Sequence, residues 1–548
     1  MTEPTAPIAE IPLISTTARI GWTLLIVATL YVCYFSHLGA IGFVGPDEPR
    51  YAWIARDMTE TGDWVTPRLY GKPWFEKPPL FYWGAALSFK LCGVSEAAAR
   101  LPSAVSALLA TLALAWLALR LYGAETARWL LLLLPTTVGM IGFSHAAATD
   151  MPFSAMLTIA MVCAAVVLGL TRKENSPFIP QTPWLALVLF GFFLGLAVLA
   201  KGPAAIILCG GTVFFWALFT KRWRAALRLF HPAALASFCL TALPWYILCA
   251  RRNPDFFHIF IIEHNFKRYF TPEFQHIQPF WFYIPILALG LLPWSVSAIG
   301  LLRDAKHSWK EGGWLSSPGL FITCWAIFPL VFFSLSKSKL PGYVLPAVPP
   351  LGLLMAQALS VRANKILPGD RWVEITSGVT LLAIALLTAL QFERTPLGFA
   401  PLIIAVVGFA SLILNNLPRT VLINAIALIV VVVLTPRGNT REILDGRLSA
   451  RAAPAAAAMI WKEYSPERSS TYKLRRSFQY SLNFYFHREL PGWSLAQAQP
   501  GWVYAPAREI SELRDLGLNC PFNALRHAVI VCEDPGSANR RPPSGQPQ

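Results

Sequence analysis

Charged residues are scarce in this chain, at 14% of its 548 residues, whereas hydrophobic residues make up 55%. A water-soluble globule needs polar faces for its surface and rarely sustains uninterrupted apolar runs of about 18 residues or more. Here such runs recur from the N-terminus to about residue 436. The composition therefore excludes a soluble globular protein and predicts a polytopic α-helical membrane protein.

Motifs of nucleotide and metal chemistry are missing as well. The chain has no P-loop, no GxGxxG after a strand and no CxxC pair of the metal-binding type, so we expect no nucleotide. Lys and Arg number 46 against 30 for Asp and Glu, a net charge of +16. No nucleic-acid motif accompanies this charge, and we expect no nucleic acid partner, because membrane proteins place basic residues in cytoplasmic loops and beside lipid phosphates.

The N-terminal sequence MTEPTAPIAEIPLISTTAR lacks the basic region and the small-residue cleavage site of a secretory signal. The first apolar run is therefore expected to be a retained membrane anchor. The membrane part also lacks an internal repeat, which weighs against many secondary transporters.

Seven of the nine cysteines lie in or beside apolar segments, where a thiol is usually a small buried hydrophobe. Cys520 and Cys532 lie instead in the polar C-terminal region. An oxidising compartment would permit a disulfide between them, but free thiols are the interpretation that we prefer.

Fourteen apolar runs are candidates for membrane spans. They are residues 20–41, 79–94, 98–121, 126–144, 151–171, 184–200, 203–220, 230–250, 280–302, 318–336, 341–360, 372–391, 398–415 and 418–436. The run 79–94 is the weakest, because a span needs about 20 residues and this run offers 16, with Lys90 among them. We expect it to lie at the interface or to re-enter, which leaves thirteen spans.

Basic loop residues support this count. With thirteen spans and the N-terminus inside, six loops carrying basic residues share the cytoplasmic side. Their basic residues are Arg120, Arg128, Arg172, Lys173, Lys221, Arg222, Arg224, Arg228, Arg303, Lys306, Lys310, Arg362, Lys365, Arg371 and Arg419. The loop 42–97, the turns 145–150 and 337–340, the loop 251–279 and the C-terminal region then face the other side. In a bacterium that side is the periplasm, and the protein is expected in the inner membrane.

The chain is predicted to have three parts. Residues 1–437 form the transmembrane domain with its periplasmic first loop 42–97. Residues 438–533 read as a small α/β domain, because ARAAPAAAAMIWKEY and REISELRDLGL are helix-like whereas WVYAP and HAVIVC are strand-like. Residues 534–548 are too poor in apolar residues to order themselves.

Residues 45–83 carry the densest set of functional side chains. Asp47, Glu48, Arg50, Glu76 and Lys77 lie there among Trp and Tyr residues. Proline suits the first position of a helix, so Pro49 places the acidic pair at the helix's N-terminal end, where the free N–H groups and the dipole keep a carboxylate ionised. Adjacent helical positions diverge by about 100°, so Asp47 should face the site and Glu48 should point elsewhere. The alternative is a solvated interfacial helix with ordinary caps.

Further polar residues fall on the same face. They are Asp150, the loop EHNFKRYFTPEFQH with His264, Arg268 and His276, and the SKSKLPGY turn with Lys337 and Lys339. Each has a simple alternative, since Asp150 could cap a helix, a loop histidine is usually a surface residue and lysines at span ends snorkel. Together, carboxylates and cations at a bilayer edge suit a substrate with an anionic head, a sugar-like body and a lipid tail.

Several motifs then carry a resemblance to a known family. DEPRYAWIARDM, GDWVTPRLYGKPWFEKPPLFYW, ARLPSA, the Asp150-Met151-Pro152 turn, LAKGPAA, EHNFKRY and KLPGYVLPAVPP resemble the lipid-linked-sugar transferases of the GT-C fold. The similarity is greatest to bacterial lipid A aminoarabinose transferases and more distant to protein O-mannosyltransferases. It covers roughly residues 20–360, and SFQYSLNFYFHRELPGW resembles a segment of the family's periplasmic domain.

The resemblance implies a glycosyltransferase that moves 4-amino-4-deoxy-L-arabinose from undecaprenyl phosphate to a lipid A phosphate. It implies catalytic roles for Asp47 and Asp150 and places Glu48, Tyr82 and Lys339 in the substrate pocket. The residues that it implies for binding the substrate phosphate are Arg50, Lys77, Lys201, Arg268 and Tyr343. It also implies a divalent metal, zinc, at Glu76, His264 and His276. A glutamate and two histidines are a known type of ligand set for zinc.

Two alternatives stay open. A lipid A phosphate is already anionic, so Asp47 could bind the donor's amino group or hold the acceptor, whereas a hydroxyl acceptor, as in protein O-mannosylation, requires Asp47 to take a proton. A lipid or sugar transporter is the rival from another class. The odd span count, the missing repeat and the charges in outer loops instead of the bilayer midplane argue against it.

Overall fold

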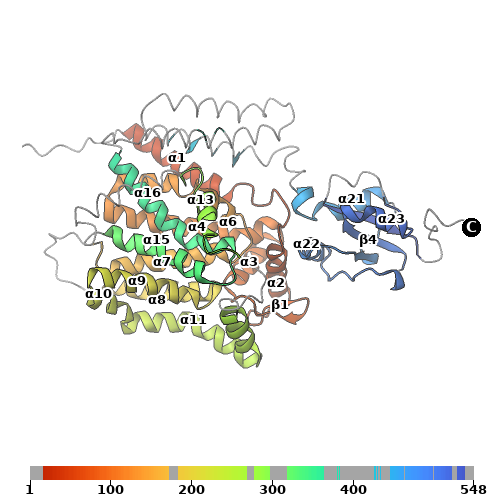
Figure 1. Cartoon of the computed structure of the whole chain (residues 1–548), viewed down its shortest axis with the longest axis horizontal. Helices are drawn as coiled ribbons and strands as arrows, with labels where there is room; N and C mark the ends of the chain where they lie inside the picture. Colours follow the sequence, from red (N-terminus) through yellow and green to blue (C-terminus); the bar gives the residue numbers. More distant parts are fainter. Residues whose placement is uncertain are drawn as a thin grey trace, which may run out of the picture.

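The computed structural model describes residues 16–171, 183–267, 277–295, 318–362, 445–520 without 462 and 498, and 528–536, with eight isolated positions between 379 and 433. Figure 1 shows a bundle of helices and, beside it, a smaller unit of helices and strands. The expected spans 372–391, 398–415 and 418–436 lie outside the described residues apart from those isolated positions, as does most of the expected tail 534–548.

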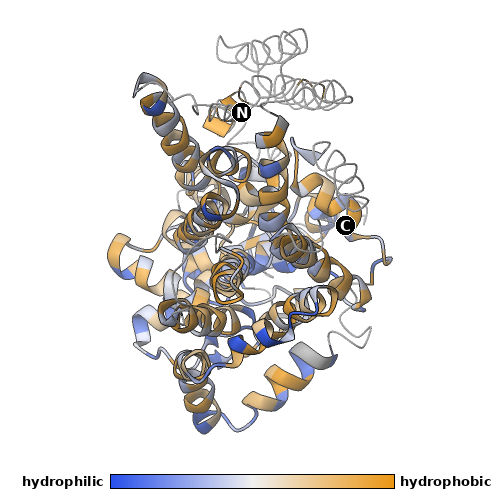
Figure 2. Cartoon of the chain, turned by 90° about the vertical axis from the view of Figure 1, so that its left-hand side faces the viewer, coloured by the Kyte–Doolittle hydropathy of each residue, from blue (hydrophilic) through white to orange (hydrophobic). Residues whose placement is uncertain are grey.

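Seven helices in the described ranges are long and apolar enough to cross a bilayer. They are α1 (Thr16–Phe35), α4 (Glu96–Tyr122), α7 (Asp150–Val167), α8 (Trp184–Lys201), α11 (Pro232–Arg252), α15 (Pro318–Leu335), and η4 (Pro341–Ala347) continued by α16 (Val348–Arg362). Figure 2 shows that the helices of the bundle consist mostly of hydrophobic residues. The prediction of a polytopic helical membrane protein is confirmed.

Helix α7 forms the centre of the bundle, with 89% of its span buried. Its sequence is apolar on all sides, as expected for a helix surrounded by others, and it packs between α4 and α8. Helix α1 instead leaves Leu24 and Tyr31 more than 60% exposed, at 66% and 63%. Such large exposed apolar side chains on a spanning helix face lipid.

The apolar run 126–144 is not one straight span. It forms α5 (Ala124–Leu133) and α6 (Val138–Ser144), which are bent by 63°. Pro135 lies at the break, where it cannot continue the helical hydrogen bonds, and Thr137 caps α6 by accepting from the Met140 N–H. Two further short helices are α9 (Ala204–Thr220) and α13 (Tyr283–Gly290).

The segment after α1 folds outside the spanning helices. It contains α2 (Asp47–Thr61), the antiparallel pair β1 (Arg68–Leu69) and β2 (Lys72–Pro73), and α3 (Leu80–Cys92). Helix α3 has 13 residues, and at about 1.5 Å per residue it is too short for a hydrocarbon core of about 30 Å. It packs on α2 and α4.

The C-terminal unit holds a three-stranded sheet of order β3-β4-β5, in which β3 is parallel and β5 antiparallel to β4. Its strands are β3 (Ser469–Thr471), β4 (Gly501–Pro506) and β5 (Val529–Asp534), and its helices are α21 (Ala452–Ile460), α22 (Arg476–Phe486) and α23 (Ile510–Asp515). WVYAP falls in β4, and HAVIVC overlaps β5.

Cys520 and Cys532 form a disulfide, so the expectation of free thiols is wrong. Cys532 lies on β5, and the bridge between Asn519 and Glu533 holds the preceding turn against that strand. The two Cα atoms are therefore 4.4 Å apart, within the range that a disulfide spans. This pairing depends on the sheet and is not visible in the cysteine spacing.

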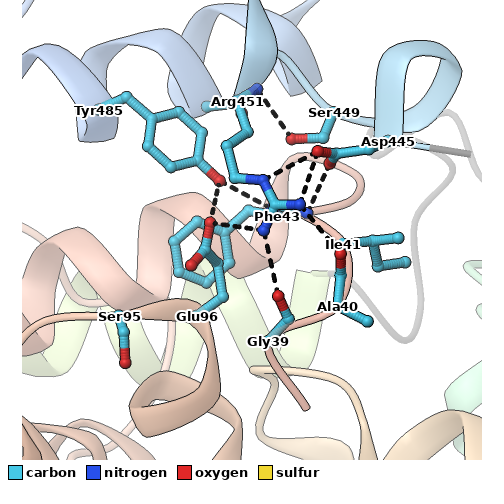
Figure 3. A network of polar contacts seen from close by, with 12 residues as sticks. Gly39, Ala40, Ile41, Phe43, Ser95, Glu96, Asp445, Ser449, Arg451 and Tyr485 are labelled. Carbon is cyan, nitrogen blue, oxygen red and sulfur yellow. Dashed lines mark hydrogen bonds and ion pairs between the residues drawn. The ribbon is translucent and has the colours of Figure 1, made fainter. Parts of the chain in front are cut away.

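Arg451 fastens the C-terminal unit to the segment after α1 (Figure 3). Its guanidinium donates to the carbonyls of Gly39 and Ala40 at 3.1 and 2.9 Å and to Asp445 at 2.8 Å. On the same face, the Tyr485 hydroxyl donates to Glu96 at 2.9 Å. The C-terminal unit thus lies on the same side of the bundle as α2 and α3.

We expect Arg451→Met to loosen this contact and to speed cleavage of the C-terminal unit in limited proteolysis. The substitution keeps the apolar stem but removes hydrogen bonds from a charged donor, each worth about 1.5–3 kcal/mol. Arg508→Met is the matched control, because Arg508 is 64% exposed and pairs with its neighbour Glu509. Equal cleavage of the two variants would show that Arg451 does not hold the unit in place.

Candidate functional site

Helix α2 begins at the point where the acidic pair was expected to cap a helix. Gly45 turns the chain with a φ of 70°, and the helix starts at Asp47, two residues before Pro49. A proline is tolerated there because the first amide groups of a helix have no intrahelical acceptor. Asp47 and Glu48 therefore occupy the first turn and point in different directions.

Glu48 points inward and pairs with Arg100 of α4. The Arg100 guanidinium donates to both Glu48 oxygens at 2.9 and 2.7 Å, and the Val44 and Ala147 amides each donate at 2.7 Å. Arg100 also donates to the carbonyls of Leu38, Ile41 and Gly42. Each Glu48 oxygen already accepts two hydrogen bonds, so the expected pocket role is replaced by a structural one.

Asp47 faces the opposite way, into a cluster of charges. Arg50 donates to Asp47 Oδ1 at 2.5 Å, and its guanidinium lies 3.0 Å from Glu76 Oε2. The Lys77 ammonium lies 3.6 Å from Glu76 Oε1. We call Asp47, Arg50, Glu76 and Lys77 the Arg50 cluster. It brings together four of the residues predicted from the sequence.

Aromatic rings enclose the guanidinium of Arg50. Its central carbon lies 5.3 Å from the ring centres of Tyr51 and Trp74 and 5.9 Å from that of Tyr480. Tyr480 belongs to α22, so the C-terminal unit contributes to the cluster. Sequence reasoning noted the segment SFQYSLNFYFHRELPGW but assigned no role to Tyr480.

Burial and charge shift the pKa values in this cluster. Desolvation by the surrounding protein raises the pKa of Asp47, and Glu76 and Asp150 raise it further, whereas Arg50 and Lys77 lower it. Burial alone would lower the pKa of Arg50, but the charges of Glu76 and Asp47 raise it above its ordinary value. The Asp47 side chain is nevertheless 50% exposed, against 12% for Arg50 and Glu76. Asp47 thus lies where a ligand can reach it.

Three buried donors around the cluster have no hydrogen-bond partner among the described residues. They are Arg50 Nε, the indole N–H of Trp74 and the hydroxyl of Tyr82. Tyr82 is fully buried, and its ring lies 5.7 Å from that of Tyr51. Buried polar groups are almost always paired, so these three donors require acceptor oxygens, which a bound water or a polar ligand would supply.

A second cluster joins the ends of two spanning helices. Asp150 begins α7, Lys201 ends α8, and Lys201 Nζ lies 2.5 Å from Asp150 Oδ1. The ring centre of Tyr343 is 4.6 Å from the same ammonium. Gly342 leaves room for this pair, because a Cβ there would collide with the Asp150 carboxylate. The structure therefore brings Asp150, Lys201 and Tyr343 together. We call these three residues the Asp150 cluster.

Lys339 is held close to its own turn. Its ammonium donates to the Ser336 carbonyl at 2.6 Å, and the side chain is buried. Burial and the nearby charge of Lys337 lower the pKa of Lys339. It lies just before η4, which carries Tyr343.

Of the three expected zinc ligands, Glu76 and His264 lie in the described residues and His276 does not, so the structure does not test the full set. Glu76 pairs with Arg50 and Lys77, and His264 lies in the π-helix η2 (His258–Lys267). In the described ranges no three His, Cys, Asp or Glu residues are grouped to hold a metal ion. Arg268 and His276 lie outside those ranges. The zinc prediction therefore rests on the resemblance alone.

Comparison with known proteins places this chain among membrane transferases. Residues 20–260 match the family described as dolichyl-phosphate-mannose-protein mannosyltransferase. The chain is 31% identical to a protein of Aeromonas hydrophila over 76% of this chain and 77% of that protein, and 30% identical to one of Aeromonas salmonicida over 76% of each. It is 35% identical to a protein of Erwinia tasmaniensis over 63% of this chain and 61% of that protein. All three are named undecaprenyl phosphate-alpha-4-amino-4-deoxy-L-arabinose arabinosyl transferase.

Two solved structures share the fold. The transferase ArnT from Cupriavidus metallidurans, crystallised with undecaprenyl phosphate, matches 95% of this chain and 98% of its own with a TM-score of 0.74 and 23% identity. The archaeal oligosaccharyltransferase AglB from Archaeoglobus fulgidus matches 96% of this chain and 75% of its own with a TM-score of 0.50 and 12% identity.

Proposed function

Because the chain belongs to the family of undecaprenyl phosphate-aminoarabinose arabinosyl transferases, we propose that it transfers 4-amino-4-deoxy-L-arabinose from undecaprenyl phosphate to a lipid A phosphate. Family membership confirms the resemblance to GT-C glycosyltransferases that use a polyprenyl-phosphate sugar. The acceptor, the inner-membrane location and the periplasmic side of the site belong to the proposal.

The charges and hydrogen-bond donors around Asp47 are the observation that supports this proposal. A half-exposed carboxylate, Asp47, lies beside the buried cation Arg50, whose Nε is one of three donors without a partner in the described ranges. A sugar phosphate offers hydroxyl and phosphate oxygens to such donors, and an amino group to a carboxylate. These groups therefore complement a charged sugar on a lipid phosphate, whereas an apolar lipid offers them no partner.

The transfer needs no proton removal when the acceptor is a phosphate. An acceptor oxygen bonds to the anomeric carbon of the sugar, the bond from that carbon to undecaprenyl phosphate breaks, and its electron pair stays on the departing phosphate. Arg50 and Lys77 stabilise this growing negative charge. Asp47 is left to hold the donor's ammonium group or to position the acceptor. If the acceptor is a hydroxyl, the raised pKa of Asp47 suits it to act as the base.

The direct test is transfer of radiolabelled aminoarabinose from undecaprenyl phosphate to lipid A by the purified protein. A transporter leaves the glycosidic bond intact, so label that stays on the donor would contradict the proposal. Mass spectrometry of lipid A from cells with and without the gene identifies the acceptor. A mass increment on a protein or on another glycan would support the hydroxyl-acceptor alternative.

We further propose thirteen spans with the first loop and the C-terminal unit in the periplasm. His487 and Glu60 lie 2.9 Å apart, which ties the C-terminal unit to α2. If α1 crosses once before this loop, an even number of spans must follow for the two to share a side. We therefore expect an impermeant thiol reagent to label Glu60→Cys and Ile510→Cys in intact spheroplasts and to spare Arg222→Cys.

This labelling requires a background in which the exposed Cys92 and Cys239 are replaced by serine. Protection of position 60 or 510 until lysis would contradict the assigned sides.

The zinc site stays a prediction. We expect Glu76→Ala and His264→Ala each to lower the zinc bound per chain, measured by metal analysis of the purified protein. Ion pairs already neutralise Glu76, and a metal cation would compete with them. Equal zinc content in both variants and the wild type would remove these residues as ligands.

A further inference from the structure

An apolar pocket lies at the end of the bundle far from the Arg50 cluster. Its volume is 350 Å³, within the range of about 300–1,000 Å³ typical of ligand sites. It is formed by α8, α9 and α11 and is closed by two short helices, α10 (Trp223–Leu227) and η1 (Arg228–Phe230). Every lining residue is apolar, so the part of a ligand that enters it must be apolar too.

The pocket lies at the opposite membrane surface from the proposed site. Helix α11 begins beside it with Pro232, and its far end reaches the first loop, where Arg252 pairs with Asp63 at 3.0 Å. The helix has 21 residues, which at about 1.5 Å each span a bilayer. Figure 1 shows α10 at the end of the bundle away from α2 and α22.

The pocket opens sideways onto the lipid-facing surface. Several of its lining side chains are also widely exposed, among them Ile206 at 45%, Leu227 at 64% and Phe230 at 67%. Gly210 on α9 lines the pocket and borders open space, because a Cβ at this position would meet no atom within 4 Å. A hydrocarbon chain can therefore enter from the bilayer without passing through water.

Four cations lie beside the pocket. Lys221, Arg222, Arg224 and Arg228 are all exposed and share a segment with the lining residues Trp223, Ala226 and Leu227. The sequence has no Asp or Glu between residues 202 and 254. Basic residues at this depth are usual on the cytoplasmic side, but here they flank an open apolar pocket. A ligand with an anionic head and a hydrocarbon tail complements both features.

We propose that this pocket binds an anionic phospholipid of the leaflet opposite the transferase site. One acyl chain fills the space beside Gly210, and the phosphate lies against Arg222, Arg224 and Arg228. This site is separate from the Arg50 cluster, so the proposal stands whether or not the aminoarabinose assignment is correct.

The test is native mass spectrometry of the full-length protein with added phosphatidylglycerol or phosphatidylcholine. We expect wild-type protein to retain phosphatidylglycerol in preference to phosphatidylcholine. Gly210→Leu should lower the retained phosphatidylglycerol at least about fivefold by filling the pocket. Its matched control is Gly21→Leu on α1, where a Cβ also meets nothing within 4 Å.

A second variant leaves the pocket intact. The triple change of Arg222, Arg224 and Arg228 to Gln should abolish the preference for the anionic lipid, a loss of about tenfold or more. Arg19→Gln with Arg120→Gln removes exposed charges elsewhere and should preserve it. Three results would overturn the proposal: no preference between the two lipids, equal retention in Gly210→Leu and Gly21→Leu, or displacement of phosphatidylglycerol by equimolar undecaprenyl phosphate.

Discussion

Asp47→Asn is expected to lower turnover by at least about 10²-fold while leaving the melting temperature nearly unchanged. The substitution removes a charge at the place where donor and acceptor are proposed to meet. It keeps the size of the side chain and an oxygen that accepts from Arg50. Arg50 also remains paired with Glu76 at 3.0 Å, so no buried cation is left alone, and the half-exposed position makes the structural cost small.

The pH dependence separates a role in chemistry from a role in folding. Burial raises the pKa of Asp47 above its ordinary value, and the ionised form is the active one in both versions of the mechanism. Wild-type kcat/KM should therefore rise as the pH increases through this raised pKa. The asparagine variant cannot titrate and should lose that part of the profile.

Asp57→Asn is the matched control. Asp57 lies on the same helix, and burial raises its pKa as well, but its charged neighbours are Arg68, Glu60 and Asp63 instead of the Arg50 cluster. Its turnover should remain near that of the wild type. A near-normal turnover in Asp47→Asn, an equal loss in Asp57→Asn, or a loss explained by unfolding would make Asp47 a structural residue.

Local sequence rules identified part of the site. The acidic pair followed by proline indicated a helix N-terminus, and the divergence of neighbouring helical positions indicated that Asp47 and Glu48 face different ways. Both hold in the structure. The bend at Pro135 was also readable, because proline interrupts a helix, although the apolar run 126–144 alone predicts one straight span.

Other features depend on partners distant in sequence. Arg100 meets Glu48 across 52 positions, and Tyr480 reaches Arg50 from the C-terminal unit. The bond between Cys520 and Cys532 follows from a strand register. No periodicity or spacing reports such contacts, because they are set by how whole elements pack. The sequence nevertheless offers one signal for the pair of Glu48 and Arg100. Arg100 lies on the long apolar helix α4, and a charge in such a place is usually paired.

Glu48→Gln is expected to lower the stability of the fold, whereas Asp47→Asn is expected to lower turnover. The Glu48 and Arg100 side chains are 8% and 3% exposed, and breaking a buried ion pair by removing one partner costs about 3–5 kcal/mol, because the other charge stays buried without compensation. Glutamine also replaces one acceptor oxygen with a donor. That donor would face Arg100 and either the Val44 or the Ala147 amide, all of which now donate to Glu48.

The effect is measurable as a lower melting temperature and a smaller yield of folded protein, with turnover per folded molecule much less affected than in Asp47→Asn. Glu48→Gln combined with Arg100→Gln is the sharpest control. It removes both charges, so it should be more stable than Glu48→Gln alone if an uncompensated Arg100 is the cause. A Glu48→Gln protein with normal melting but lost turnover would instead place Glu48 in the substrate pocket. Its pairing with Arg100 would then have to open during the reaction.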